Sequence, residues 1–163
     1  MSGPARPVRL FLDAGVIIEG CFAQWGTSKA VLILATVRPS FTVVLAEAIE
    51  REVQRTLARK VATLDAAAAH AITQSVAGWL DRVRVERHPL PAPDEIRRLA
   101  PSILPALRHV NDLPAVVTAL HARPDWVLST NTEHWNDRLA TRTGLRIATP
   151  LAFLRQLSPT RGA

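Results

Sequence analysis

Short apolar segments alternate with segments of helical spacing along almost the whole chain, and this alternation constrains the fold more than any other feature. The strand candidates are short and mostly rich in β-branched residues: residues 8–12, 41–45, 83–87, 126–129 and 145–149. Between them, Ile49, Val53 and Leu57 repeat at every fourth position, and an Ala-rich helical stretch covers residues 65–80. Strands that alternate with helices form parallel sheets with helices on both faces. The pattern predicts an α/β fold, a three-layer α/β/α sandwich with a mainly parallel central sheet of about five strands.

The length of the chain limits its domain organisation. With 163 residues, 48% of them hydrophobic and 21% charged, it can bury one sizeable core and is too short for two ordinary domains. The Pro-rich residues 88–93 are therefore interpreted as a connection, because neither flanking part could bury a full core alone. We expect residues 1–163 to form a single domain.

The sequence favours a cytoplasmic protein with no membrane partner. No apolar run approaches the ~20 residues that span a bilayer, and the N-terminus lacks the pattern of a secretory signal. Cys21 is the only cysteine, so it cannot form an intrachain disulfide and has no second cysteine with which to bind zinc. A single, unpaired cysteine is consistent with a protein that functions in a reducing compartment.

The charge balance is basic. The chain has 20 Lys and Arg residues against 14 Asp and Glu residues, a formal net charge of +6. A positive surplus favours an anionic partner such as nucleic acid. All the basic residues except Lys29 and Lys60 are Arg, and a compositional bias of the genome would explain this as well as phosphate recognition does. Net charge alone leaves both explanations open.

Four polar residues follow strand candidates. Asp13 ends the first one, Glu52 lies in the helical segment after the second, Asp112 opens "DLPAVVTAL", and Asn131 follows "WVLST". Sites on parallel sheets form at the carboxyl ends of the strands. Clustered carboxylates raise one another's pKa unless a divalent cation shares them, and Mg²⁺ and Mn²⁺ prefer oxygen ligands. These positions are candidates for one metal site, although a chain with 14 acidic residues always offers such candidates.

Each acidic candidate also has a structural alternative. Asp13 and Asp112 are both placed to cap the N-terminus of a following helix, which does not exclude metal binding. Glu52 lies at the margin of an apolar helical stripe, where a surface glutamate is ordinary, and Glu47 and Glu50 are the nearest substitutes for it as a ligand.

Four segments together resemble a known family. They are "LFLDAGVII", "VVLAEAIEREVQRTL", "NDLPAVVTALHARPDWVLSTNTEHW" and "GLRIATPLAFLRQL". In this order and spacing they resemble the successive motifs of PIN-domain proteins, which include toxin components of bacterial toxin–antitoxin pairs. The resemblance extends from Val8 to Leu157. It implies the PIN-like fold and a metal-dependent endoribonuclease that hydrolyses single-stranded RNA with Mg²⁺ or Mn²⁺. It also leaves an antitoxin protein and a homodimer open as partners beside RNA.

The resemblance assigns roles to the four polar residues. Asp13, Glu52 and Asp112 take the positions of acids that hold metal, and Asn131 takes a fourth catalytic position, where it would orient a water. Metal held there would activate water for attack on phosphorus.

Other side chains near these acids are less well defined by the sequence. Arg51, Arg55 and Arg108 are the arginines nearest to them and are candidates to hold the RNA backbone, with none singled out. His134 and Trp135 are either a base-stacking pair or, more commonly for such an aromatic, core packing.

Two departures from the family pattern lower the expected metal affinity. Gly15 stands where Asn or Ser is usual, so a polar partner for Asp13 is expected to be missing, and Asn131 replaces an aspartate. The alternative function is therefore a catalytically weak or inactive PIN-like RNA-binding module. A phosphatase or nucleotide-binding domain is disfavoured, because no Gly-rich phosphate loop follows the first strand.

Overall fold

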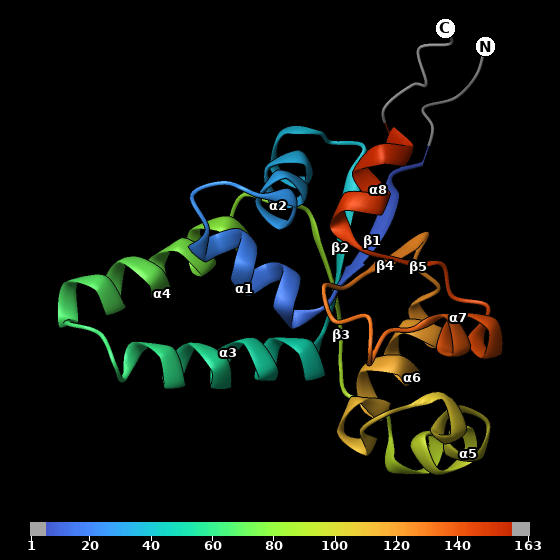
Figure 1. The fold of residues 1–163 in the computed structure, drawn as a ribbon. Coiled ribbons are helices and arrows are strands. Elements are labelled where there is room, and N and C mark those ends of the chain that lie inside the picture. The colour runs from blue at the N-terminus through green and yellow to red at the C-terminus, as the bar shows by residue number, and fades with distance from the viewer. Residues whose placement is uncertain (1–5, 158–163) are drawn as a thin grey trace, which may run out of the picture.

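A five-stranded parallel sheet forms the centre of the computed structural model, which describes residues 6–157 (Figure 1). The strands are β1 (Val8–Leu12), β2 (Phe41–Ala46), β3 (Val85–His88), β4 (Trp126–Leu128) and β5 (Ile147–Ala148). They lie in the order β3-β2-β1-β4-β5, and every neighbouring pair is parallel. The order reverses at β1, so the carboxyl ends of β1, β2 and β4 meet at the kind of crevice where parallel sheets hold sites.

Helices cover both faces of this sheet. They are α1 (Ala14–Phe22), α2 (Thr27–Val37), α3 (Glu47–Val61), α4 (Ala66–Leu80), α5 (Pro93–Ile103), α6 (Leu113–Ala122), α7 (Asp137–Thr143) and α8 (Pro150–Leu157). Helices α1, α2 and α8 pack on one side, with α3 and α4 extending from it as a helical pair, and α5, α6 and α7 lie on the other side (Figure 1). The three-layer α/β/α fold expected from the sequence is confirmed.

The core lies between the sheet and these helices. All six residues of β2 are buried, as expected of a parallel strand with helices on both faces. Phe153 of α8 packs edge-on against Phe41 and Trp126, with ring centroids 6.2 and 5.5 Å away. Helices α1 and α2 approach closely at Gly20, where an added Cβ would lie 2.5 Å from Leu32 Cδ1.

The strand boundaries differ from the sequence prediction at both edges of the sheet. The third strand covers Val85–His88 rather than residues 83–87, and the fifth is reduced to Ile147–Ala148 from the expected 145–149. Edge strands pair on one side only, so fewer ladder hydrogen bonds determine where they begin and end. None of the helices within residues 6–157 combines the length and apolar character needed to cross a bilayer.

Candidate active site

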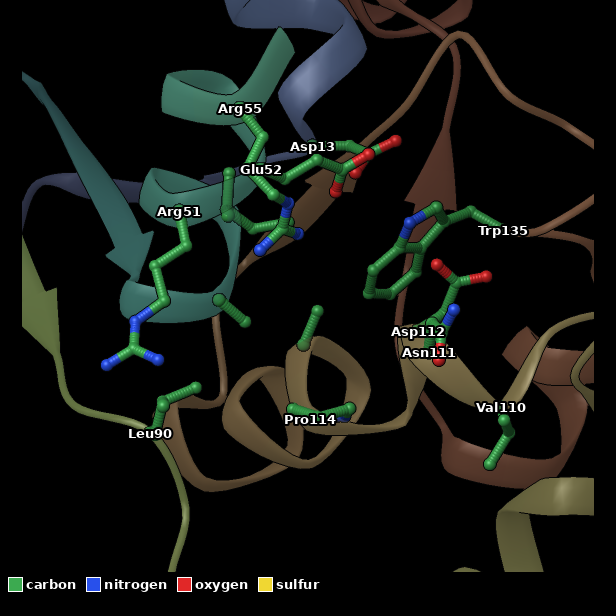
Figure 2. A pocket seen from close by; sticks show the side chains of 13 residues that line it. Asp13, Arg51, Glu52, Arg55, Leu90, Val110, Asn111, Asp112, Pro114 and Trp135 are labelled. Atoms are coloured by element: carbon green, nitrogen blue, oxygen red, sulfur yellow. The ribbon is translucent and has the colours of Figure 1, made fainter. Parts of the chain in front are cut away.

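Three acidic side chains from distant parts of the chain line one cavity of about 550 Å³. Asp13 directly follows β1, Glu52 lies in α3, which continues β2, and Asp112 directly precedes α6. Figure 2 shows Asp13 and Glu52 on one side of the cavity and Asp112 below the indole of Trp135. The cavity lies at the carboxyl edge of the sheet, so the fold brings together the three residues that the sequence proposed as metal ligands.

Asp13 has a well-defined polar environment. Its backbone N–H donates to Leu128 O at 2.9 Å, and its carboxylate Oδ2 accepts a hydrogen bond of 2.7 Å from the hydroxyl of Ser129. Burial raises the pKa of Asp13, while the Ser129 hydroxyl and, to a smaller extent, the indole of Trp135 oppose this increase. The expectation that Asp13 lacks a polar partner is therefore wrong, because Ser129, the residue directly after β4, supplies it.

Gly15 fits this arrangement for a steric reason. An added Cβ at Gly15 would lie 2.9 Å from Oγ1 of Thr130, the residue after Ser129. A larger residue at this position would require Thr130 to move. The hydroxyl of Thr130, in the loop after β4, thus occupies part of the space that a polar side chain at position 15 would need.

Glu52 shares the electrostatic field of the other two acids. Partial loss of hydration in the cavity raises the pKa of its carboxyl, and the charges of Asp13 and Asp112 raise it further, whereas Arg55 lowers it. Carboxylates that raise one another's pKa are stabilised when a cation is shared among them.

Asp112 has one buried carboxylate oxygen, Oδ2, that accepts no hydrogen bond from the described residues. Its nearest polar neighbour is the imidazole of His134, whose Nδ1 lies 3.0 Å from this oxygen, and the ring of His109 packs edge-on against His134 at a centroid distance of 4.8 Å. Neither Asp112 nor Asp13 accepts a capping hydrogen bond from the helix that follows it. Both residues occupy N-cap positions, and the backbone N–H of Ala14 at the start of α1 helps to lower the pKa of Asp13, so a structural role stands beside the proposed metal binding.

Asn131 is placed differently. It is exposed, it is not among the residues that line the cavity, and its Oδ1 accepts a hydrogen bond of 3.3 Å from the backbone N–H of His134. The structure thus brings three of the four predicted site residues together, with the Asn131 side chain turned toward its own loop.

The oxygen donors suit a hard cation in their chemistry. Among residues 6–157 no three His, Cys, Asp or Glu side chains lie close enough to form a ready-made metal site. Mg²⁺, however, usually keeps several waters and is held by only one or two carboxylates together with substrate phosphates. The accumulation of negative charge fits such an ion, and so does the buried Oδ2 of Asp112, which accepts no hydrogen bond from the described residues although His134 Nδ1 lies 3.0 Å away; Asp13, Glu52 and Asp112 would be the donors.

Several cavity-lining residues had no signal in the sequence. Leu90 comes from the Pro-rich connection before α5, and Val110 and Asn111 come from a single 3₁₀ turn, Val110–Asp112, before α6. Trp135 lines the cavity but is 5% exposed and packs against Phe11, which agrees with the core-packing alternative. Loops of this kind lack periodicity, so only the folded chain reveals which of their side chains reach the site.

The sequence matches no family model and no curated protein, but solved structures share its fold. One is VapBC2 from Rickettsia felis bound to a DNA fragment from their promoter, with a TM-score of 0.62 and 12% identity over 87% of this chain and 98% of that chain. Another is PAE2754 from Pyrobaculum aerophilum, with a TM-score of 0.62 and 15% identity over 92% of this chain and 89% of that chain. VapC proteins are PIN-domain toxins. The chain therefore has a PIN-like fold, as its sequence motifs predicted.

Proposed function

We propose that this chain is a metal-dependent endoribonuclease that hydrolyses phosphodiester bonds of single-stranded RNA. The observation that carries the proposal is the cavity at the carboxyl edge of the sheet, into which Asp13, Glu52 and Asp112 converge from three elements. A convergent acidic cavity with perturbed carboxyl groups is typical of metal-assisted phosphoryl chemistry. The basic balance of the chain, +6 at neutral pH, supports an anionic substrate.

The side chains have separate roles in this proposal. Asp13, Glu52 and Asp112 hold Mg²⁺ or Mn²⁺, which when bound supplies the Lewis acidity that activates a water and neutralises charge on the phosphate oxygens. Ser129 orients the Asp13 carboxylate through its hydroxyl, and His134 lies against the buried oxygen of Asp112.

Asn131 remains part of the proposal as the residue that orients the attacking water. To do so, its side chain must leave the backbone N–H of His134, which it contacts at 3.3 Å. This exchange involves one long hydrogen bond at an exposed loop, so its free-energy cost is small, of the order of 1 kcal/mol or less.

A toxin role with a protein antitoxin is part of the same proposal. Of the two structures named above, one is a VapBC2 complex bound to DNA from its promoter, and VapC is the PIN-domain toxin. We further propose that the chain acts as one domain in the cytoplasm, where its RNA substrates are, with a homodimer as the assembly to be tested by light scattering.

The decisive experiment is cleavage of end-labelled single-stranded RNA by the purified protein. We expect cleavage with Mn²⁺, weaker cleavage with Mg²⁺ and none with EDTA. Mn²⁺ binds sites of carboxylate and amide oxygens more tightly than Mg²⁺ does, and it tolerates less regular coordination geometry. Asp81→Asn is the matched control for Asp13→Asn, since Asp81 follows α4 outside the cavity. Equal activity of Asp13→Asn and wild-type protein would contradict the proposed site.

One observation favours a second function. Asn131, the fourth predicted site residue, is uncharged and does not line the cavity, as expected of a PIN-like RNA-binding module with little or no catalysis. Such a module would bind RNA with a steep salt dependence and cleave nothing at any Mn²⁺ concentration. That pair of results would replace the nuclease with the binding module.

A further inference from the structure

The arginines near the acidic residues differ in how they are paired. Arg51 donates a hydrogen bond to Glu47 at 2.6 Å, four residues earlier in α3, and Arg108 forms an ion pair with Glu133. Arg55 also lies in α3 and lines the cavity. Within residues 6–157 it takes part in no hydrogen bond or ion pair, so its guanidinium donors are available to a ligand.

The position of Arg55 follows from the geometry of α3. Ala48, Arg51, Glu52 and Arg55 all line the cavity, and this spacing of three and four residues places them on one face of the helix. Figure 2 shows the Arg55 side chain directed into the cavity, with its guanidinium between Arg51 and Trp135 in that view. The same helix face therefore presents an acid for metal and, one turn later, an unpaired cation.

The electrostatic environment explains what this cation can bind. Arg55 lowers the pKa of Glu52 through its charge, yet the two side chains form no ion pair. A guanidinium with five donors in a rigid fork matches the oxygens of a phosphate, which would otherwise be repelled by the three carboxylates of the cavity. Leu90 and Val110, which are 36% and 63% exposed, add apolar surface to the same cavity, against which a nucleotide base can rest.

We infer that Arg55 binds a backbone phosphate of single-stranded RNA next to the metal-binding acids. The inference rests on the proposed function, because it takes RNA as the substrate. It assigns the role to one of three candidate arginines and makes Arg55 a substrate-binding residue that acts without reading the base sequence, since phosphate contacts carry no sequence information.

The test measures RNA affinity against salt in the absence of cleavage. Wild-type protein, Arg55→Gln, Arg55→Lys and Arg59→Gln are titrated in EDTA into labelled single-stranded RNA of about 12 nucleotides, with NaCl from about 50 to 200 mM. Arg59 is the matched control: it lies one turn further along α3, donates to Thr56 and does not line the cavity. Thermal melting of each variant checks that the fold is intact.

The expected results separate a phosphate contact from general surface charge. Arg55→Gln should weaken binding by about 3- to 10-fold and reduce the slope of log Kd against log salt by about 0.7, equally for A-rich and U-rich RNA. Arg55→Lys should recover part of the affinity, because it keeps the charge and loses the fork. Arg59→Gln should leave the slope unchanged.

An unchanged slope in Arg55→Gln, or an equal decrease in Arg55→Gln and Arg59→Gln, overturns the inference. Failure of the proposed function gives a different result. If wild-type protein binds RNA but does not cleave it with Mn²⁺, the proposed nuclease activity is wrong. The slopes of log Kd against log salt for wild type and Arg55→Gln then still decide whether Arg55 binds phosphate. Wild-type protein that does not bind RNA contradicts both.

Discussion

Ser129→Ala removes one hydroxyl from the site and gives the sharpest test of how Asp13 is held. Ser129 is 2% exposed, donates to Oδ2 of Asp13 at 2.7 Å and accepts a hydrogen bond from the backbone N–H of Asn131 at 3.0 Å. After substitution by Ala, the Asp13 carboxylate loses its strongest side-chain donor and the Asn131 N–H loses its acceptor.

The magnitude follows from the type of hydrogen bond. A hydrogen bond to a charged group contributes about 1.5–3 kcal/mol, which corresponds to a decrease in Tm of about 3–12 °C for a chain of this size. Loss of a partner that orients a metal ligand typically weakens metal binding by about 10–100-fold. Because Ser129 lowers the pKa of Asp13, its removal raises that pKa further, and Mn²⁺ must then displace a more tightly held proton.

Two measurements check this prediction. Thermal melting without metal reports the change in stability, and the rise of Tm with Mn²⁺ concentration reports metal affinity independently of RNA cleavage. We expect the pH at which Mn²⁺ binding is half-maximal to be higher in Ser129→Ala than in the wild type. Thr130→Val is the matched control, because it removes the neighbouring hydroxyl, which forms no hydrogen bond to Asp13. If Ser129→Ala and Thr130→Val have equal Tm values and equal Mn²⁺ affinities, Ser129 does not orient Asp13.

Three further predictions concern other positions. Asp13→Asn should abolish cleavage yet raise Tm at about pH 8. Folding raises the pKa of Asp13, so ionisation of this carboxyl makes the folded protein less stable as pH increases, and Asn cannot ionise. A lower Tm of the variant would contradict this. Asn131→Asp should raise Mn²⁺ affinity in calorimetry, because it adds a fourth negative charge near the three acids; an unchanged affinity would mean that residue 131 stays turned toward the His134 backbone N–H, as Asn131 is, and would remove it from the proposed site. Gly20→Ala should destabilise the fold by about 1–3 kcal/mol in urea unfolding, because its Cβ would meet Leu32. Gly78→Ala, with open space around it in the last turn of α4, should stabilise by up to about 1 kcal/mol, and a similar effect of both variants would refute close packing at Gly20.

Much of the architecture was contained in local sequence pattern. Segments such as residues 8–12 and 41–45 are mostly apolar, with Arg9 and Thr42 as their single polar residues, and a mostly apolar run is the local requirement for a strand buried on both faces. The alternation of such strands with helices allows few topologies, because parallel strands need crossover helices of one hand. The positions of Asp13 and Asp112 at the ends of these elements were visible for the same reason, and their convergence followed from the parallel arrangement.

The edges of the sheet and the loops were less predictable. The short strand Ile147–Ala148 pairs only with β4, so its length depends on a partner rather than on its own residues. Leu90 and Val110 enter the cavity from segments without periodicity. Neither the length of this edge strand nor the reach of these two loop residues produces a periodic pattern that could be recognised in the sequence.

Contacts between residues distant in sequence were decided by the tertiary structure alone. Ser129 and Asp13 are 116 positions apart, and their hydrogen bond exists because β1 and β4 are neighbours in the sheet. Asn131 faces its own loop, and Arg55 lacks the partner that Arg51 has in Glu47. The sequence by itself determined which residue types occur at the ends of which elements, since strand and helix patterns are local. Which side chains pair, and which remain free to bind a ligand, depends on distances across the fold that no local pattern encodes.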